Sequence, residues 1–290
     1  MSAADAAPRK GHIEIRDVSV RFGRNGHSTE AVSGISLEVT PGDFVTVIGP
    51  SGCGKSTLLN IVAGFMKPTE GQALLDGAPI SGPGADRGVV FQQYSLFPWM
   101  TVRKNVEFGL KMQGLGQHQR ETAARSLLGM TGLLPFENHY PEQLSGGMKQ
   151  RVGIVRALAT SPQVMLMDEP FGALDSQTRT VMQEILTNMW QQLQLSVLFI
   201  THDIEEAIFL SEKVYVMTAR PGRIKAEIPI PLPRPRTPEM MASPTFHALV
   251  RQVKALIRDE SLAAMGGELG ATGLQGLDHQ FAHDGMKALT

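Results

Sequence analysis

The stretch GPSGCGKST at residues 49–57 separates the apolar run 44–48 from the segment 58–62, in which apolar residues recur. It fits the pattern G-x-x-x-x-G-K-[ST] at Gly49, Gly54, Lys55 and Ser56. Glycines let the backbone wrap an anion without a Cβ collision, and the N–H groups at the start of a helix hold that anion. The stretch therefore predicts a loop that binds the phosphates of a nucleotide between a buried strand and a helix.

We expect each residue of this loop to contact the nucleotide: Gly49, Pro50, Ser51, Gly52, Cys53, Gly54, Lys55, Ser56 and Thr57. The Lys55 ammonium would reach the β- and γ-phosphates of ATP, and the Ser56 hydroxyl would ligate Mg²⁺. A glycine-rich turn can match this pattern by chance. The strand before the loop and the helix after it favour the nucleotide site over that alternative.

A second motif, VMLMDEP at 164–170, is an apolar strand that delivers two adjacent acids at its end. Buried charge is costly unless it is used, so this arrangement is unusual. Asp168 would hold Mg²⁺ through water, and Glu169 would be the general base that polarises the attacking water. The alternative is a strand end with two solvated acids, which the neighbouring phosphate loop disfavours.

Composition limits the other function classes. The 290 residues carry a formal net charge of −1, which gives no bulk electrostatic case for binding nucleic acid or anionic membrane. The single cysteine, Cys53, excludes an intrachain disulfide and fits a reducing compartment. No apolar run approaches the ~18 residues that a membrane-spanning helix needs, and residues 1–12 lack the apolar core of a secretory signal. We therefore expect a soluble, cytosolic protein.

Apolar runs that read as strands alternate with helical patterns, which indicates an α/β fold with a mainly parallel sheet. Expected strands cover 13–22, 35–39, 44–49, 88–92, 163–170, 196–202 and 213–218. Residues 23–29 are expected to form a loop, residues 95–150 to be mostly helical, and residues 246–260 to form a helix. Val181, Ile185, Met189 and Leu193 recur every four positions, which predicts an amphipathic helix over 177–195. Residues 1–11 and the Gly-rich tail from about 261 are expected to lack regular structure.

A third motif, LSGGMKQR at 144–151, would place Ser145, Gly146 and Gly147 before a helix as a second anion cradle. Taken alone, Ser-Gly-Gly is better explained as a helix cap. Together with the other motifs, however, it resembles the LSGGQ signature of the ATP-binding subunits of ABC transporters, with Met148 in place of the usual glutamine. The resemblance implies a P-loop NTPase of the ABC type, with a mainly parallel RecA-like core sheet, an antiparallel β subdomain and a helical subdomain. It places this domain at 12–225, with the helical subdomain at about 95–150, and leaves 226–290 as a C-terminal extension.

The resemblance also assigns roles to four further residues in their expected order. Phe22 would stack on adenine, Gln92 would sense Mg²⁺, Asp175 would cross a dimer interface, and His202 would contact the γ-phosphate. Three of them also have a purely structural explanation. Phe22 would pack in the core, Gln92 would be a solvated amide, and His202 would be a histidine whose ring nitrogens are hydrogen-bonded within the protein. In this family the phosphate loop of one subunit faces the signature of another. The resemblance therefore implies a head-to-tail homodimer with two ATP molecules between its subunits.

Such a cytosolic ATPase would act as a peripheral protein on the cytoplasmic face of the inner membrane and grip two separate membrane-spanning permease subunits. The contact would involve residues 92–105, where Phe97, Pro98, Trp99 and Met100 would form an apolar socket. Alternatively Trp99 packs within the helical subdomain, and both roles are compatible.

The segments at 82–110, 219–224 (ARPGRI) and 233–236 (PRPR) resemble the nitrate, sulfonate and taurine importer subfamily. This resemblance implies a small anion as cargo, delivered by a periplasmic binding protein. The alternative that the chain is an importer ATPase for another small solute stays open. So does a soluble ABC-type ATPase of DNA repair or translation, although no heptads appear between Thr57 and Leu144. A phosphate-loop kinase would have no use for the signature or His202, and Glu169 disfavours a regulator without turnover.

Overall fold

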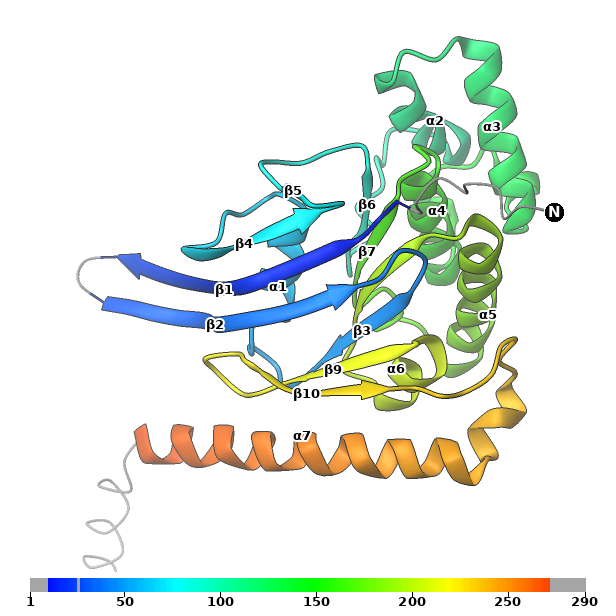
Figure 1. Cartoon of the computed structure of the whole chain (residues 1–290). Helices are drawn as coiled ribbons and strands as arrows, with labels where there is room; N and C mark the ends of the chain where they lie inside the picture. The colour runs from blue at the N-terminus through cyan, green and yellow to red at the C-terminus, as the bar shows by residue number, and fades with distance from the viewer. Residues whose placement is uncertain (1–9, 25–26, 272–290) are drawn as a thin grey trace, which may run out of the picture.

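The computed structural model describes residues 10–24 and 27–271, and a six-stranded sheet forms its centre (Figure 1). The strand order is β10-β9-β3-β8-β7-β6, in which β10 alone runs antiparallel to its neighbour. The strands are β3 (Phe44–Ile48), β6 (Arg87–Val90), β7 (Val164–Asp168), β8 (Ser196–Ile200), β9 (Lys213–Met217) and β10 (Ile224–Pro229). This agrees with the mainly parallel core sheet expected from the sequence.

A second, antiparallel sheet has the order β2-β1-β4-β5. Its strands are β1 (Ile13–Arg24), β2 (His27–Val39), β4 (Glu70–Leu75) and β5 (Ala78–Pro79). Most of the segment 23–29, expected as a loop, belongs to strands, because β1 and β2 continue to pair as far as Arg24 and His27. The antiparallel pairing extends beyond the apolar alternation that marks 13–22 and 35–39. The hydrophobic pattern alone therefore predicts both strands to be shorter than they are.

Strand β3 connects two hydrophobic cores, and all five of its residues are buried. Val45 and Val47 pack with the antiparallel sheet and with α1 (Lys55–Val62), whereas Phe44 and Ile48 belong to the core on the opposite face. The alternation follows from the period of two along a strand. The loop that follows β3 is therefore held between two buried elements, β3 and α1.

The helical segment stands at one end of the sheet (Figure 1). It contains α2 (Val102–Met112), α3 (Gln117–Met130), the short turns η1 (Leu134–Phe136) and η2 (Pro141–Gln143), and α4 (Gly146–Leu158). These elements share a separate core that includes Val106, Leu128 and Val152. The arrangement agrees with the predicted helical subdomain, although α4 continues beyond residue 150.

Helix α5 (Ser176–Leu193) confirms the expected helix, but only Met189 and the half-buried Ile185 of the four predicted apolar positions face the core. Val181 and Leu193 are exposed, whereas the buried face holds Met182, Leu186, Met189 and Trp190. A spacing of four residues drifts around a helix that has 3.6 residues per turn, so a stripe of this period cannot stay on one face. The observed spacing of i, i+4, i+7, i+8 follows the turn.

The C-terminal elements cover the side of the core away from the antiparallel sheet. They are α6 (Ile204–Leu210), η3 (Pro238–Ala242) and α7 (Pro244–Ala271), and Phe246 and Val253 of α7 are fully buried. Residues 261–271, expected to lack regular structure, continue α7, whereas 1–9 and 272–290 lie outside the described residues. No helix in the described part of the chain combines the length and apolar composition needed to cross a bilayer.

Candidate active site

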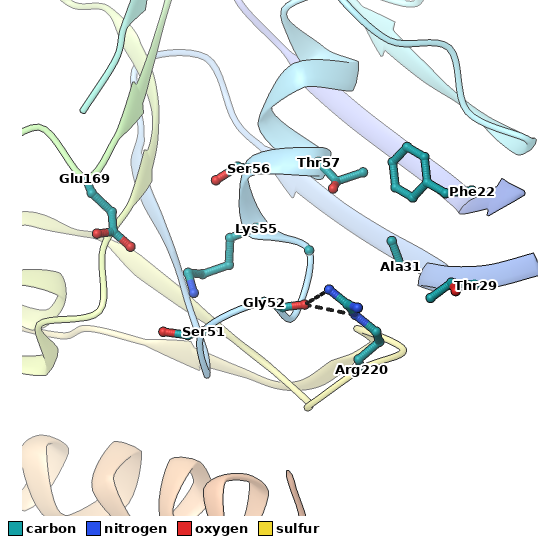
Figure 2. Close-up of a pocket in the computed structure, with 11 residues that line it drawn as sticks. Phe22, Thr29, Ala31, Ser51, Gly52, Lys55, Ser56, Thr57, Glu169 and Arg220 are labelled. Carbon is teal, nitrogen blue, oxygen red and sulfur yellow. Dashed lines mark hydrogen bonds between the residues drawn. The ribbon is translucent and has the colours of Figure 1, made fainter. Parts of the chain in front are cut away.

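A cleft of about 450 Å³ opens beside the 49–57 loop (Figure 2). Its walls come from β1 and β2 of the antiparallel sheet, from the 49–57 loop with the start of α1, and from the loops after β7 and β9. The lining residues are Phe22, Thr29, Ala31, Ser51, Gly52, Gly54, Lys55, Ser56, Thr57, Glu169 and Arg220. The phosphate-loop prediction and the adenine-side prediction therefore meet in one concave site, as ligand binding requires.

Two glycines of the loop adopt conformations that other residues avoid. Gly52 has φ +72° and Gly54 has φ +100°, both in the left-handed region. A Cβ built on Gly54 would lie 2.3 Å from Cγ1 of Val32 and 3.1 Å from the carbonyl oxygen of Ala31. The loop is thus pressed against strand β2 at Gly54, and a larger residue there would displace it. Packing against β2 therefore requires glycine at position 54, and the close approach of a phosphate to the loop stays a prediction.

Lys55 is buried at the start of α1, and its side chain turns back across the loop. Its Nζ donates hydrogen bonds to the carbonyl oxygens of Gly49, at 2.9 Å, and Pro50, at 3.0 Å. These hydrogen bonds give the buried ammonium two acceptors and hold the loop in its curved shape. A phosphate entering the loop would offer the same ammonium a charged acceptor, which makes a stronger hydrogen bond than a carbonyl does.

Ser56 and Asp168 meet although 112 positions separate them in the numbering. The Ser56 hydroxyl lies near enough to the Asp168 carboxylate to influence its titration. Burial raises the pKa of Asp168, and the Ser56 hydroxyl and the charge of Lys55 oppose that rise. A hydroxyl and a carboxylate are hard oxygen ligands of the kind Mg²⁺ prefers. Within residues 10–24 and 27–271, no group of three or more His, Cys, Asp or Glu side chains is placed to hold a metal ion.

Glu169, His202 and Gln92 come together at one edge of the core sheet. Their side chains follow the ends of β7, β8 and β6, three neighbouring parallel strands whose carboxyl ends share that edge. Oε2 of Glu169 lies 3.0 Å from Nδ1 of His202 and 3.5 Å from Nε2 of Gln92. Glu169 also has φ +44°, a conformation that is uncommon for a residue with a side chain and that clusters at functional sites. The geometry supports the predicted grouping of base and switch residues.

Phe22 lies on β1 at the far end of the cleft, with 47% of its surface exposed. It is not a core residue, so the packing alternative is wrong, and one aromatic face is available for stacking. Thr29 pairs with Phe22 across the antiparallel sheet, and Ala31 is two residues further along β2. These two small neighbours leave room beside the ring. The sequence interpretation did not include either of them.

The signature residues lie elsewhere. Ser145 caps α4, accepting a hydrogen bond from the Met148 N–H at 3.3 Å, and Asp175 caps α5 in the same way through the Thr178 N–H at 3.0 Å. The helix-cap alternative is thus correct for Ser145. In the described part of the chain neither these residues nor Gly146 and Gly147 line the cleft. Their predicted contact with nucleotide therefore requires another copy of the chain.

Arg220, which follows β9, is the other lining residue that sequence reasoning missed. Its Nε and Nη2 donate hydrogen bonds to the carbonyl oxygen of Gly52 at 3.3 and 3.2 Å (Figure 2). The ARPGRI segment had stood out only as a subfamily resemblance. No local pattern shows that this loop returns to the phosphate loop.

Comparison with known proteins agrees with this geometry. Residues 32–172 match the family described as "ABC transporter". The chain is 50% identical over 253 residues to the nitrate import ATP-binding protein NrtD of Synechocystis sp. (strain ATCC 27184 / PCC 6803 / Kazusa), an alignment that covers 85% of this chain and 95% of that protein. This chain is an ABC transporter ATP-binding protein. It is also 47% identical to the taurine import ATP-binding protein TauB of Rhizobium johnstonii (strain DSM 114642 / LMG 32736 / 3841), over 84% of this chain and 96% of that one.

The solved structures agree as well. The ABC chain superimposes with a TM-score of 0.68 on the ATP-binding cassette MJ0796, described as dimeric in a post-hydrolysis state with ADP and Pi, at 33% identity over 75% of this chain and 98% of that one. The predicted fold class, a P-loop ABC cassette, is confirmed. The family also confirms that the chain is an ATPase.

Proposed function

We propose that this chain is the ATP-hydrolysing subunit of an importer for a small anion of the nitrate, sulfonate or taurine class. One observation carries the proposal: Glu169, which contacts both His202 and Gln92, lines the same cleft as the phosphate loop. The similarity to import proteins named for nitrate and taurine supports the cargo class. We take residues 12–225 as the ATP-binding domain and 226–290 as an extension, part of which packs on that domain.

Binding would use the two ends of the cleft. The adenine would stack on the exposed ring of Phe22, and the triphosphate would run along the loop from Gly49 to Thr57. Lys55 would exchange its carbonyl acceptors for phosphate oxygens. Because the loop glycines already hold their left-handed conformations, little reorganisation is needed before the phosphates enter.

Ser56 and Asp168 would hold Mg²⁺, the serine directly and the aspartate through water, with Gln92 as the third polar contact. When bound, the ion neutralises charge on the phosphates. The closeness of Ser56 to Asp168 and the partial burial of Asp168 fit this role, because a cation would replace the proton that burial otherwise favours on the carboxylate.

Glu169 would accept the proton of the attacking water as that oxygen bonds to the γ-phosphorus and the bond to the β–γ bridging oxygen breaks. ADP leaves with the bridging oxygen, and phosphate carries the oxygen of water. His202 would position Glu169 through its Nδ1 and direct its other face toward the γ-phosphate. Gln92 would complete the polar ring around the water.

A second copy of the chain would complete each site in a head-to-tail homodimer. Ser145, Gly146 and Gly147 form the N-terminal end of α4, where N–H groups favour an anion, and Asp175 would line the contact. Their place away from the cleft of their own chain supports this arrangement, as does the dimeric state of the MJ0796 cassette. The exposed Trp99 region would dock two membrane-spanning permease subunits, which holds the protein on the cytoplasmic face of the membrane.

The test is ATP-dependent uptake in proteoliposomes that contain this chain and candidate permease subunits from the same organism, with a matching solute-binding protein supplied. We expect uptake of nitrate, taurine or an alkanesulfonate with wild-type protein and none with Glu169→Gln. Uptake of a chemically different solute would overturn the cargo class alone. Full ATPase activity without any uptake or membrane association would favour the soluble ABC-type ATPase instead.

A further inference from the structure

The loop between β9 and β10, residues 218–223, lies against the phosphate loop. Arg220 reaches across and places two guanidinium nitrogens on one carbonyl oxygen, that of Gly52 (Figure 2). Gly52 has φ +72°, so its peptide is turned into an orientation that few residues adopt, and the guanidinium stabilises that orientation from outside. Arg220 also lines the cleft, which places its positive charge near the entering phosphates.

The backbone of the 218–223 loop is itself tightly fixed. Gly222 donates a hydrogen bond to the carbonyl oxygen of Ala31 at 2.9 Å and accepts one from the Ser33 N–H, also at 2.9 Å. A Cβ built on Gly222 would lie 2.0 Å from the carbonyl oxygen of Cys53. The loop therefore touches the phosphate loop at Cys53 as well as at Gly52, and movement of one displaces the other.

The opposite side of the same loop is held by the C-terminal helix. Oε2 of Glu260, on α7, accepts a hydrogen bond from the N–H of Ala219 at 2.9 Å, and Oε1 forms an ion pair with Lys225 at 2.7 Å. The Glu260 side chain is only 15% exposed, so this contact is well shielded from water. Glu260 thus holds the backbone of Ala219, the residue directly before Arg220, in place.

We propose that Arg220 is a positioning residue for ATP and that α7 sets its place through Glu260. On this view the C-terminal extension determines nucleotide affinity through the contacts Glu260–Ala219 and Arg220–Gly52. The inference rests on the proposed nucleotide site and assigns it a regulatory element. A partner that displaces α7 would raise the Kd for ATP. Chemistry at Glu169 is not altered, so the effect falls on binding.

The first test compares Arg220→Ala with Arg223→Ala, which removes an equal charge from an exposed position of the same loop. With full-length protein, ATP binding is measured by calorimetry in EDTA, and kcat and KM are measured with Mg²⁺. We expect Arg220→Ala to raise Kd and KM about tenfold with kcat within about twofold, and Arg223→Ala to match wild type. Arg220→Lys should recover only part of the affinity, because an ammonium cannot reproduce the two-nitrogen contact.

The second test asks whether Glu260 acts through Arg220. Glu260→Ala should raise Kd about threefold, whereas Asp259→Ala, which removes a charge at a 72% exposed neighbour, should not. The double variant Arg220→Ala/Glu260→Ala should bind ATP as Arg220→Ala does. Glu260→Gln, which keeps an acceptor for Ala219 and loses the ion pair with Lys225, should bind like wild type, and a raised Kd in this variant would overturn the role of the Ala219 contact.

Additive effects in the double variant would overturn the coupling, and wild-type affinity in Arg220→Ala would overturn the whole inference. A wild-type protein that fails to bind ATP would instead refute the nucleotide site on which the inference rests.

Discussion

Oε2 of Glu169 lies 3.0 Å from Nδ1 of His202, although the two residues stand 33 positions apart in the chain. Adjacent parallel strands, β7 and β8, bring them together, and Glu169 takes an uncommon backbone conformation with φ +44°. When Nδ1 carries the ring hydrogen it donates to the carboxylate, which orients the base and leaves Nε2 on the other side of the ring. The fold itself therefore places the carboxylate beside the imidazole.

We expect Glu169→Gln to abolish turnover while ATP binding is kept. The amide preserves the size of the side chain but cannot accept a proton, and loss of a general base costs about 10²–10⁴-fold in rate. Phosphate release should fall to background and Kd for ATP should stay within about twofold of wild type. The variant should also run as an ATP-dependent dimer in size-exclusion chromatography, since the nucleotide proposed to hold two copies together is not consumed. Full activity in this variant would remove Glu169 from the role of base.

His202→Ala should lower kcat rather than ATP affinity. The alanine removes the hydrogen-bond partner of Glu169 and the proposed γ-phosphate contact, and loss of one such donor costs about 10²–10³-fold. Steady-state kinetics should show that fall in kcat with KM changed by less than about threefold. A variant with unchanged kcat and a much larger KM would mean that His202 contributes to binding alone.

Lys55→Ala should weaken nucleotide binding itself. Among the described residues the ammonium forms no ion pair with a carboxylate, and it donates instead to the Gly49 and Pro50 carbonyl oxygens, so its charge is available to phosphates. Removal of a charge-assisted contact of this kind raises Kd by about 10- to 100-fold. Calorimetry with ATP measures the change, and Lys67→Ala, at an exposed position after α1, is the matched control. Binding unchanged in Lys55→Ala would refute the phosphate-loop assignment.

The sequence predicted the parts of the site that are short and continuous. The 49–57 loop needs glycine at fixed positions next to a strand and a helix, so nearby residues in the sequence determine its geometry. The acids at 168–169 lie at the end of a buried strand, which the apolar run before them predicts. The parallel core was predictable for the same reason, because alternating strands and helices leave few topologies.

Other features depend on pairing between distant segments. Thr29 lines the cleft because the register of β1 and β2 places it opposite Phe22, and Arg220 lines it because its loop packs on Cys53 and Gly52. No periodicity reveals either contact. The buried face of α5 was misjudged because exposed Val181 and Leu193 are apolar too, so composition alone does not separate the two faces.

A bulky thiol reagent should block ATP binding by modifying Cys53, but slowly. The thiol is fully buried, and burial raises its pKa despite the nearby Lys55 charge. Because the thiolate is the reactive form, the rate of labelling should keep rising with pH beyond the ordinary cysteine range near ~8.5. Saturating ATP should slow the reaction, since the loop must open to expose the sulfur. Labelling followed by mass spectrometry measures both effects, and Cys53→Ser is the control. Labelled protein that hydrolyses ATP at the normal rate would refute this prediction.

Trp99 is 70% exposed, so it does not simply pack within the helical subdomain, although its ring meets that of Phe97 at 5.7 Å. The loop that carries it is held from within by Asn105, a fully buried residue. Its Nδ2 donates to the carbonyl oxygens of Phe97, Met100 and Thr101 at 3.2, 3.0 and 3.1 Å. The indole is therefore presented on a rigid support.

Trp99→Ala should leave the melting temperature and the ATPase rate of the isolated protein unchanged but weaken its capture by detergent-solubilised permease at least about tenfold, as expected for a central aromatic contact. Leu193→Ala, which removes an exposed apolar side chain from α5, should bind the permease normally. Asn105→Ala should lose both permease binding and thermal stability, because it leaves buried backbone groups without partners. Normal capture of Trp99→Ala would place the permease contact elsewhere on the surface.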